Sequence, residues 1–395
     1  MAKRLHGPRT TVAWLAQQAE REDLKEGDED LDEGDRVAGT PSPRGGATGR
    51  QRTRRKPGRR RRPVRHTTSW TPWRRVLAVV AVLALVLLVG VTVLDDDTPP
   101  LGLAGLPAIL EDNAPESERT VDVHAGYGTW VDLYDYLPRG SNPPTVTPAT
   151  VSTMAAQGVR TLYLQAAQLD PETPELLTDE RLLAEFLVQA HEAGMKVVGW
   201  YLPRFVDLDR DLAHLEAISE FEVLGHRFDG VGVDIEWTNG IADHDDRSAR
   251  LVDLSQRLRE TVGDDDALAA IVLPPVQIEV VNPNKWPNFP WRELADLYDV
   301  WMPMGYWTER QPASGYNDGF RYTDENVRRI RANLDDPDAP VHAIGGIGDR
   351  VTADQAQRFV DAIEGNDVIG GSIYDWSTLD PAVGATIAEG LPDPD

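Results

Sequence analysis

From about residue 120 to the end, short apolar runs alternate with amphipathic segments. Eight strand candidates span residues 128–134, 160–165, 196–202, 230–236, 269–273, 299–306, 341–347 and 368–376. Most of them are near-continuous apolar runs, as strands buried on both faces are. Apolar residues recur at helical spacing in the segments between them, as over residues 179–193, 209–221, 248–262, 323–334 and 352–363. This alternation predicts an α/β fold built on a parallel sheet.

Eight strand–helix units in about 275 residues match the size of a (β/α)8 TIM barrel. A doubly wound open sheet is the alternative, but it needs no eighth strand, and this domain shows no glycine-rich phosphate loop. We therefore predict a TIM barrel over residues 120–395.

A longer apolar pattern occupies Val76–Leu94, nineteen residues without a charge. At ~1.5 Å per residue a helix over this run spans about 28 Å, close to the thickness of the hydrocarbon core of a bilayer. Arg74 and Arg75 precede the run and Asp95–Asp97 follow it, which predicts a cytoplasmic N-terminus. We expect a single-pass signal anchor in the cell membrane, a linker over residues 95–119 and an extracytoplasmic barrel.

The net charge of −25 averages two unlike parts of the chain. Residues 1–75 carry 19 Lys+Arg and 10 Asp+Glu, a net of +9, whereas the other 21 and 55 leave residues 76–395 at −34. That acidity argues against nucleic acid as a partner of the barrel. The first 75 residues have the composition of a disordered tail. Their basic run, Arg50–Arg65, is interpreted as the topogenic flank of the anchor; a nucleic-acid-binding tail is the alternative.

Cysteine is absent from the chain. Disulfides, thiol catalysis and cysteine-ligated metals are therefore excluded. We expect neither a cofactor nor a metal site.

The strongest chemical signal lies in Phe228–Trp237, which reads FDGVGVDIEW. Asp234 and Glu236 have one residue between them, so on a strand their side chains point the same way. Two acids are costly to bury, and such pairs lie at functional sites or in ion-pair networks. Because active sites of TIM barrels lie at the carboxyl ends of the strands, we favour a functional role over pairing with an arginine.

The ends of the other strands add aromatic and polar side chains. Aromatic rings stack on sugar rings, and carboxylates bind hydroxyls, so we predict a carbohydrate ligand. The predicted substrate-binding residues are Trp130, Asp132, Gln165, Trp200, Trp307, Asp349, Tyr374 and Trp376. Core packing is the alternative role for Tyr306 and Trp376, and a helix N-cap before residues 352–363 is the alternative for Asp349.

The order of these motifs resembles glycoside hydrolases of the family 18 chitinase type. In that family the fourth strand reads DGxDxDxE, the sixth ends in Met-x-Tyr-Asp, and the eighth holds a Trp. The matching residues here are Asp229, Gly230, Asp234, Glu236, Met304, Tyr306 and Trp376. Gly232 and Trp307 stand where the family has Asp, and the third strand lacks the Ser-x-Gly-Gly pattern.

The resemblance implies catalytic roles for Glu236, Asp234 and Tyr306. Glu236 would donate a proton to the leaving group, Asp234 would orient a 2-acetamido group or stabilise positive charge, and Tyr306 would hydrogen-bond the intermediate. When the acetamido oxygen attacks, no second catalytic carboxylate is needed. Otherwise a nucleophile or base is required, and the choice stays open among Asp132, Asp349 and Asp375.

The sequence thus predicts a membrane-anchored, extracytoplasmic glycoside hydrolase-like protein that cleaves a polysaccharide by acid-assisted hydrolysis. A non-catalytic carbohydrate-binding barrel of the cell envelope is the alternative, favoured by the missing acid at Gly232. A third hypothesis is a signalling or scaffolding protein that acts through its cytoplasmic tail.

Overall fold

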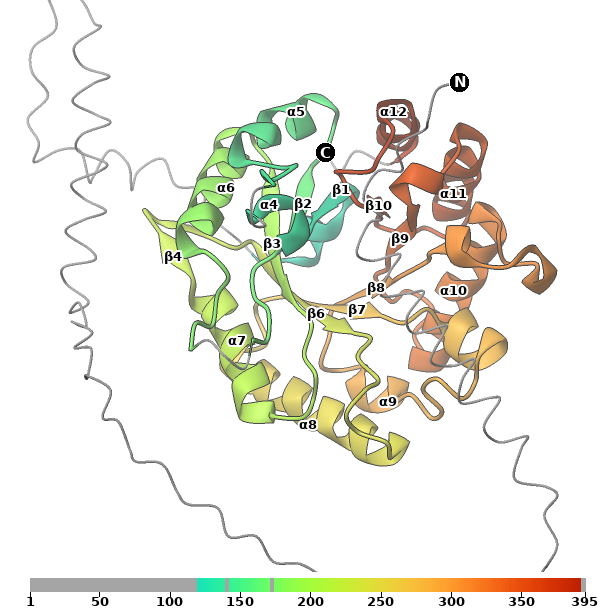
Figure 1. Ribbon diagram of the computed structural model, residues 1–395. Helices are drawn as coiled ribbons and strands as arrows, with labels where there is room; N and C mark the ends of the chain where they lie inside the picture. The colour runs from blue at the N-terminus through green and yellow to red at the C-terminus, as the bar shows by residue number, and fades with distance from the viewer. Residues whose placement is uncertain (1–118, 139–141, 171–173, 392–395) are drawn as a thin grey trace, which may run out of the picture. The chain divides into compact units, whose positions relative to one another are not determined.

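The computed structural model describes residues 119–138, 142–170 and 174–391 (Figure 1). The predicted tail, the predicted membrane helix over residues 76–94 and nearly all of the predicted linker lie outside these residues. Within the described part of the chain, no helix combines the length and hydropathy that a membrane span requires.

Eight parallel strands form the centre of the domain, in the order β8-β7-β6-β3-β2-β1-β10-β9. They are β1 (Gly126–Val131), β2 (Thr161–Gln165), β3 (Lys196–Tyr201), β6 (Gly230–Ile235), β7 (Leu268–Val272), β8 (Val300–Pro303), β9 (His342–Ile347) and β10 (Gly370–Tyr374). Single bridges from Trp301 to Val341 and from Met304 to Ile344 join β8 to β9. The sheet is therefore closed into a barrel.

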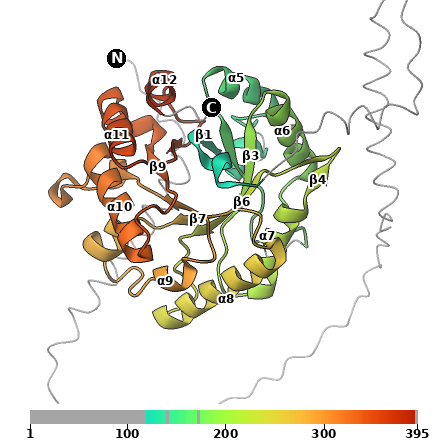
Figure 2. The ribbon, with the colours of Figure 1, turned by 180° about the vertical axis from the view of Figure 1, so that it is seen from behind.

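Helices surround the strands, as both views along the barrel show (Figures 1 and 2). One follows each strand in turn: α5 (Val151–Ala156), α6 (Glu180–Glu192), α7 (Leu208–Glu220), α8 (His244–Val262), α9 (Trp291–Leu294), α10 (Gly319–Leu334), α11 (Ala353–Gly365) and α12 (Pro381–Gly390). A single-turn helix, α4 (Leu133–Tyr136), follows β1 directly, and a small hairpin of β4 (Glu222–Val223) and β5 (His226–Arg227) precedes β6. The predicted (β/α)8 barrel is confirmed.

Alternate residues of each strand face the barrel interior or the helices. In β3 a Cβ on Gly199 would meet Ile218 of α7, whereas the ring of Trp200 lies 5.9 Å from that of Trp130 inside the barrel. Both faces of the strands are thus buried, which is why the strands read as near-continuous apolar runs.

Several strand bounds and one N-cap assignment differ from the prediction: β8 ends at Pro303 and not at residue 306, and β10 ends at Tyr374 and not at residue 376. The first strand ends at Val131 and not at Tyr134, because the side chain of Asp132 accepts hydrogen bonds from the backbone of α4 and starts that helix. The N-cap of α11 is Thr352, whose hydroxyl accepts from the Gln355 N–H. Asp349 lies three residues earlier, in a 3-10 turn.

Candidate active site

Asp234 and Glu236 lie at the carboxyl end of β6. Asp234 is buried and Glu236 is partly exposed. Gly232 belongs to the same side of the strand as Asp234, and a Cβ there would lie 3.2 Å from Cβ of Trp200 in the barrel interior. The two carboxylates therefore lie at the end of the barrel where the strands open, and Glu236 is the more accessible of the two.

Both carboxyl groups hold their protons more strongly than ordinary acids do. Burial and the charge of Glu236 raise the pKa of Asp234 well above its usual range. Burial also raises the pKa of Glu236, against the opposing effect of the Lys285 ammonium. Oδ1 of Asp234 has no hydrogen-bond partner, and among the described residues no arginine or lysine lies within 4.0 Å of either carboxylate. A carboxyl group that stays protonated at higher pH can serve as a general acid.

Tyr306 lies beyond the end of β8, in the same region. Its ring centre is 5.9 Å from that of Tyr374. Burial raises its pKa well above the usual range, and the charges of Glu236 and Asp234 add to the effect. The phenol of Tyr306 therefore keeps its proton and lies within reach of the charges of Asp234 and Glu236.

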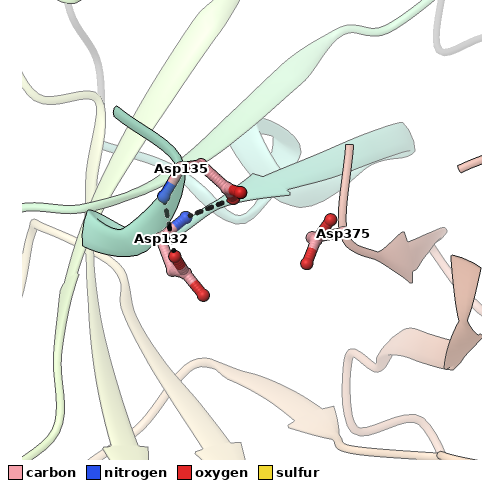
Figure 3. A group of neighbouring side chains, drawn as sticks. All are labelled: Asp132, Asp135 and Asp375. Carbon is pink, nitrogen blue, oxygen red and sulfur yellow. Dashed lines mark hydrogen bonds between the residues drawn. The ribbon is translucent and has the colours of Figure 1, made fainter. Parts of the chain in front are cut away.

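Three further carboxylates gather where β1 and β10 end: Asp132, Asp135 and Asp375 (Figure 3). The hydroxyl of Tyr374 donates to Oδ2 of Asp132 at 2.8 Å. Burial raises the pKa of Asp132 to about 6 and that of Asp135 to about 7, and it raises the pKa of Asp375 too. This acidic cluster was only partly predicted, because Asp135 was missed. Its spacing of three residues from Asp132, typical of a capping box, was the available signal.

The acidic cluster has the oxygen atoms that a hard cation prefers, with one from each residue within 4.8 Å of the others. Those carboxylates already accept local hydrogen bonds. Asp132 and Asp135 each accept from the backbone N–H of the other in a capping box. Oδ1 of Asp375 accepts from Ser377 at 2.7 Å and from the Thr378 N–H at 3.0 Å. These bonds account for the cluster without an ion.

Trp130, Trp200 and Gln165 fill the barrel beneath the carboxylates. The Trp130 indole donates to Oγ of Ser372 at 2.8 Å and stacks on Tyr163 with ring centres 4.5 Å apart. Oε1 of Gln165 accepts from a backbone N–H at 3.2 Å. Only 2% of Trp130, 5% of Trp200 and 7% of Gln165 are exposed, so these predicted substrate-binding residues form the floor of the site.

The remaining predicted residues are more scattered. Trp307 is buried between β9 and α11, with its ring 5.3 Å from that of Phe359. Its side chain therefore packs on the helix side of the sheet. The Asp349 side chain is about half exposed and lies 3.8 Å from Arg350. Trp376 is half-buried, and its backbone N–H donates to the Trp130 carbonyl at 3.1 Å.

Two surface hollows lie elsewhere. One of about 400 Å³ is lined by residues of α11 and α12. The other, of about 340 Å³, lies at the rim near the start of α8 and includes Val206 and Asp243. Neither is lined by Asp234 or Glu236, so the candidate site is defined by its chemistry and by its position at the strand ends.

No protein-family model matches the chain, and no curated protein matches its sequence. Solved structures do match its fold. The endo-β-1,4-mannanase from Thermotoga petrophila aligns with a TM-score of 0.51 at 11% identity, over 67% of this chain and 76% of that one. A family 18 chitinase from Pseudoalteromonas aurantia aligns with a TM-score of 0.49 at 13% identity, over 68% of this chain and all of that one. The chain is thus similar in fold to the barrels of glycoside hydrolases.

Proposed function

We propose that this barrel hydrolyses glycosidic bonds in a polysaccharide, with Glu236 as the general acid. The observation that carries the proposal is the pair Asp234 and Glu236. These two neighbouring carboxyls have raised pKa values, no described arginine or lysine lies within 4.0 Å of them, and they lie at the open end of a closed barrel. Structural acids in ion-pair networks are paired with cations, and these are not.

In the proposed reaction, Glu236 transfers its proton to the oxygen of the leaving sugar as the bond to the anomeric carbon breaks. Asp234 is buried beside Glu236 and, with its raised pKa, acts as a hydrogen-bonding group that orients the substrate or Glu236. Tyr306 donates a hydrogen bond to the intermediate. An acetamido substrate would supply its own nucleophile; with any other sugar, Asp132 or Asp375 is a candidate for the second carboxylate. Water then attacks the anomeric carbon and gives a proton to Glu236, which restores the acid.

The test uses the full-length chain in detergent and a panel of polysaccharides, with release of reducing ends as the measurement. Glu236→Gln keeps the size of the side chain but holds no transferable proton, so we expect kcat to fall by about 10²- to 10⁴-fold. Glu389→Gln, the same change at an exposed position of α12, is the matched control and should keep full activity. Equal rates for the wild type and Glu236→Gln would remove Glu236 from the mechanism.

A non-catalytic carbohydrate-binding barrel is the second candidate function. It is favoured by Gly232, where a Cβ would lie 3.0 Å from Ile271 and 3.2 Å from Trp200, so that no third acid fits on this strand. This alternative predicts glycan binding without turnover, with affinity that survives Glu236→Gln and is lost in Trp376→Ala.

We also propose that the protein is held in the cell membrane by Val76–Leu94, with its N-terminus in the cytoplasm and the barrel outside. The uncharged run and its basic flank support this topology. Protease added to intact cells should digest the barrel and spare residues 1–75. If the protease digests the N-terminal tail and spares the barrel, the topology is the opposite of the one proposed.

A further inference from the structure

Lys285 lies in the segment between β7 and α9, which belongs to the same end of the barrel as the acid pair. Lysine is rare in this domain: only Lys196 and Lys285 occur after residue 119. Lys196 forms an ion pair with Asp229 at 3.1 Å. Lys285 is half-buried, and it has no ion pair with any carboxylate in the described part of the chain.

Arg247 fixes Lys285 next to the segment that follows Glu236. Its guanidinium donates to the Thr238 carbonyl at 2.8 Å and to the Lys285 carbonyl at 3.1 Å. The same group lies over the Trp286 ring, 4.4 Å from its centre. The buried side chain of Arg247 thus links the backbone of Thr238, two residues after Glu236, to the backbone of Lys285.

The charge of Lys285 acts on Glu236 across this junction. Burial raises the pKa of Glu236, and the Lys285 ammonium opposes that rise. A second cation lies close by, because the Arg204 guanidinium stacks over the ring of Trp237 at 4.8 Å. Arg204 also has no ion pair with another described residue.

Two cations that form no ion pair with a described residue therefore lie along the segment that follows Glu236, in a part of the chain whose net charge is −34. Such an arrangement is unfavourable for a neutral ligand, because polar groups that lose water on binding need partners. A carboxylate on the ligand would supply that partner, and both Lys and Arg bind carboxylates by charge-assisted hydrogen bonds.

We propose that Lys285, together with Arg204, binds a carboxylate carried by a sugar next to the cleaved bond, so that the substrate is an acidic glycan. This inference rests on the proposed function, since it assumes that a glycan occupies the acid pair.

The test compares two pairs of glycans, and the members of each pair differ in whether they carry free carboxylates. The first pair is chitotetraose and the tetrasaccharide of alternating N-acetylglucosamine and N-acetylmuramic acid, which adds lactyl carboxylates. The second pair is tetragalacturonate and its methyl ester. Calorimetry on the full-length chain in detergent, at low salt, gives the dissociation constant of each, and the two pairs separate a lactyl carboxylate from a uronate.

We expect the carboxylated member of at least one pair to bind at least about tenfold more tightly than its neutral partner. Lys285→Met should abolish that preference and Lys285→Arg should keep most of it. Thermal unfolding of both variants should match the wild type, because the Lys285 carbonyl still accepts from Arg247. Glu236→Gln should leave the preference unchanged.

Equal binding within both pairs, or a preference that survives Lys285→Met, would show that Lys285 does not bind a ligand carboxylate. The proposal that the barrel is a glycosidase would then still stand. Binding of none of the four glycans would count against both proposals.

Discussion

At the scale of single residues, the candidate site is a group of acids that keep their protons. Asp132, Asp135, Asp234, Glu236 and Asp375 all have raised pKa values, and burial is the first cause in each. A charged carboxylate loses the solvation of water when it is buried, and few cations compensate here. The burial that raises the pKa of Glu236 also acts on the acidic cluster, which therefore becomes a source of instability at high pH.

Asp135 allows a direct test of that instability. The unfolded chain releases this proton near pH 3.8, whereas the folded chain holds it until about pH 7. The contribution to stability is therefore complete below pH 3.8 and is lost as the pH rises through 7. Asp135→Asn cannot ionise and can still accept from the Asp132 N–H. We expect its free energy of unfolding, relative to wild type, to increase between pH 4 and pH 8 by on the order of 2 kcal/mol.

Urea unfolding followed by tryptophan fluorescence at each pH gives this difference. Asp253→Asn, at a half-exposed position of α8, is the control and should show no pH-dependent difference from the wild type. A constant offset for Asp135→Asn across the pH range would contradict the prediction.

At the scale of elements, β10 lies between β1 and β9 in the barrel wall and pairs with both. The close spacing of β10 to its two neighbours depends on Gly370, because a Cβ there would lie 2.6 Å from the Gly126 carbonyl oxygen and 2.6 Å from Nδ1 of His342. Both neighbours belong to the barrel wall, so neither can move without separating two strands. The glycine is required by the spacing of the strands.

Gly370→Ala should therefore destabilise the barrel by about 3 kcal/mol, at the upper end of the usual cost of overpacking. Gly365→Ala makes the same change at the end of α11, where a Cβ would meet nothing within 4 Å, and it should be neutral or stabilising by about 0.5 kcal/mol. Far-UV circular dichroism during urea unfolding measures both. Similar effects of the two substitutions would show that packing at β10 is not the cause.

At the scale of the whole molecule, Arg119 anchors the start of the barrel at the end opposite the acid pair. Its guanidinium donates to the Phe228 carbonyl at 2.9 Å and to the Ser219 carbonyl at 2.6 Å, and it pairs with Asp266 at 2.9 Å. Its own carbonyl accepts from the Ala267 N–H at 2.6 Å. One side chain thus joins the approaches to β6 and β7 to the end of α7.

Arg119→Ala should lower the stability of the barrel by about 3 kcal/mol, because a buried ion pair and its hydrogen bonds lose one partner. Arg119→Lys should recover only part of this loss, since an ammonium cannot make the forked contacts of a guanidinium. Arg292→Ala, which breaks an exposed pair with Asp335, should change stability by less than about 0.5 kcal/mol. The midpoints of urea unfolding compare the three variants. A shortened protein that begins at residue 120, the predicted start of the barrel, lacks Arg119 and should lose the same stability.

The order of strands and helices could be predicted from the sequence alone. Strands buried on both faces read as apolar runs and helices buried on one face read as amphipathic segments, and both patterns involve residues close together in the chain. The sequence also determined that Asp234 and Glu236 share a side of one strand, since alternation is a property of the backbone. Which residues from distant parts of the sequence lie together at the candidate site depends on the tertiary structure. Closure of β1 against β10 brings Tyr374 to Asp132 across 242 positions, and Arg247 ties Lys285 to the segment after Glu236. The packing of α11 likewise draws Trp307 into the core. Such contacts depend on how the closed sheet and its helices pack against one another. The periodicity of apolar residues along the chain carries no information about this packing.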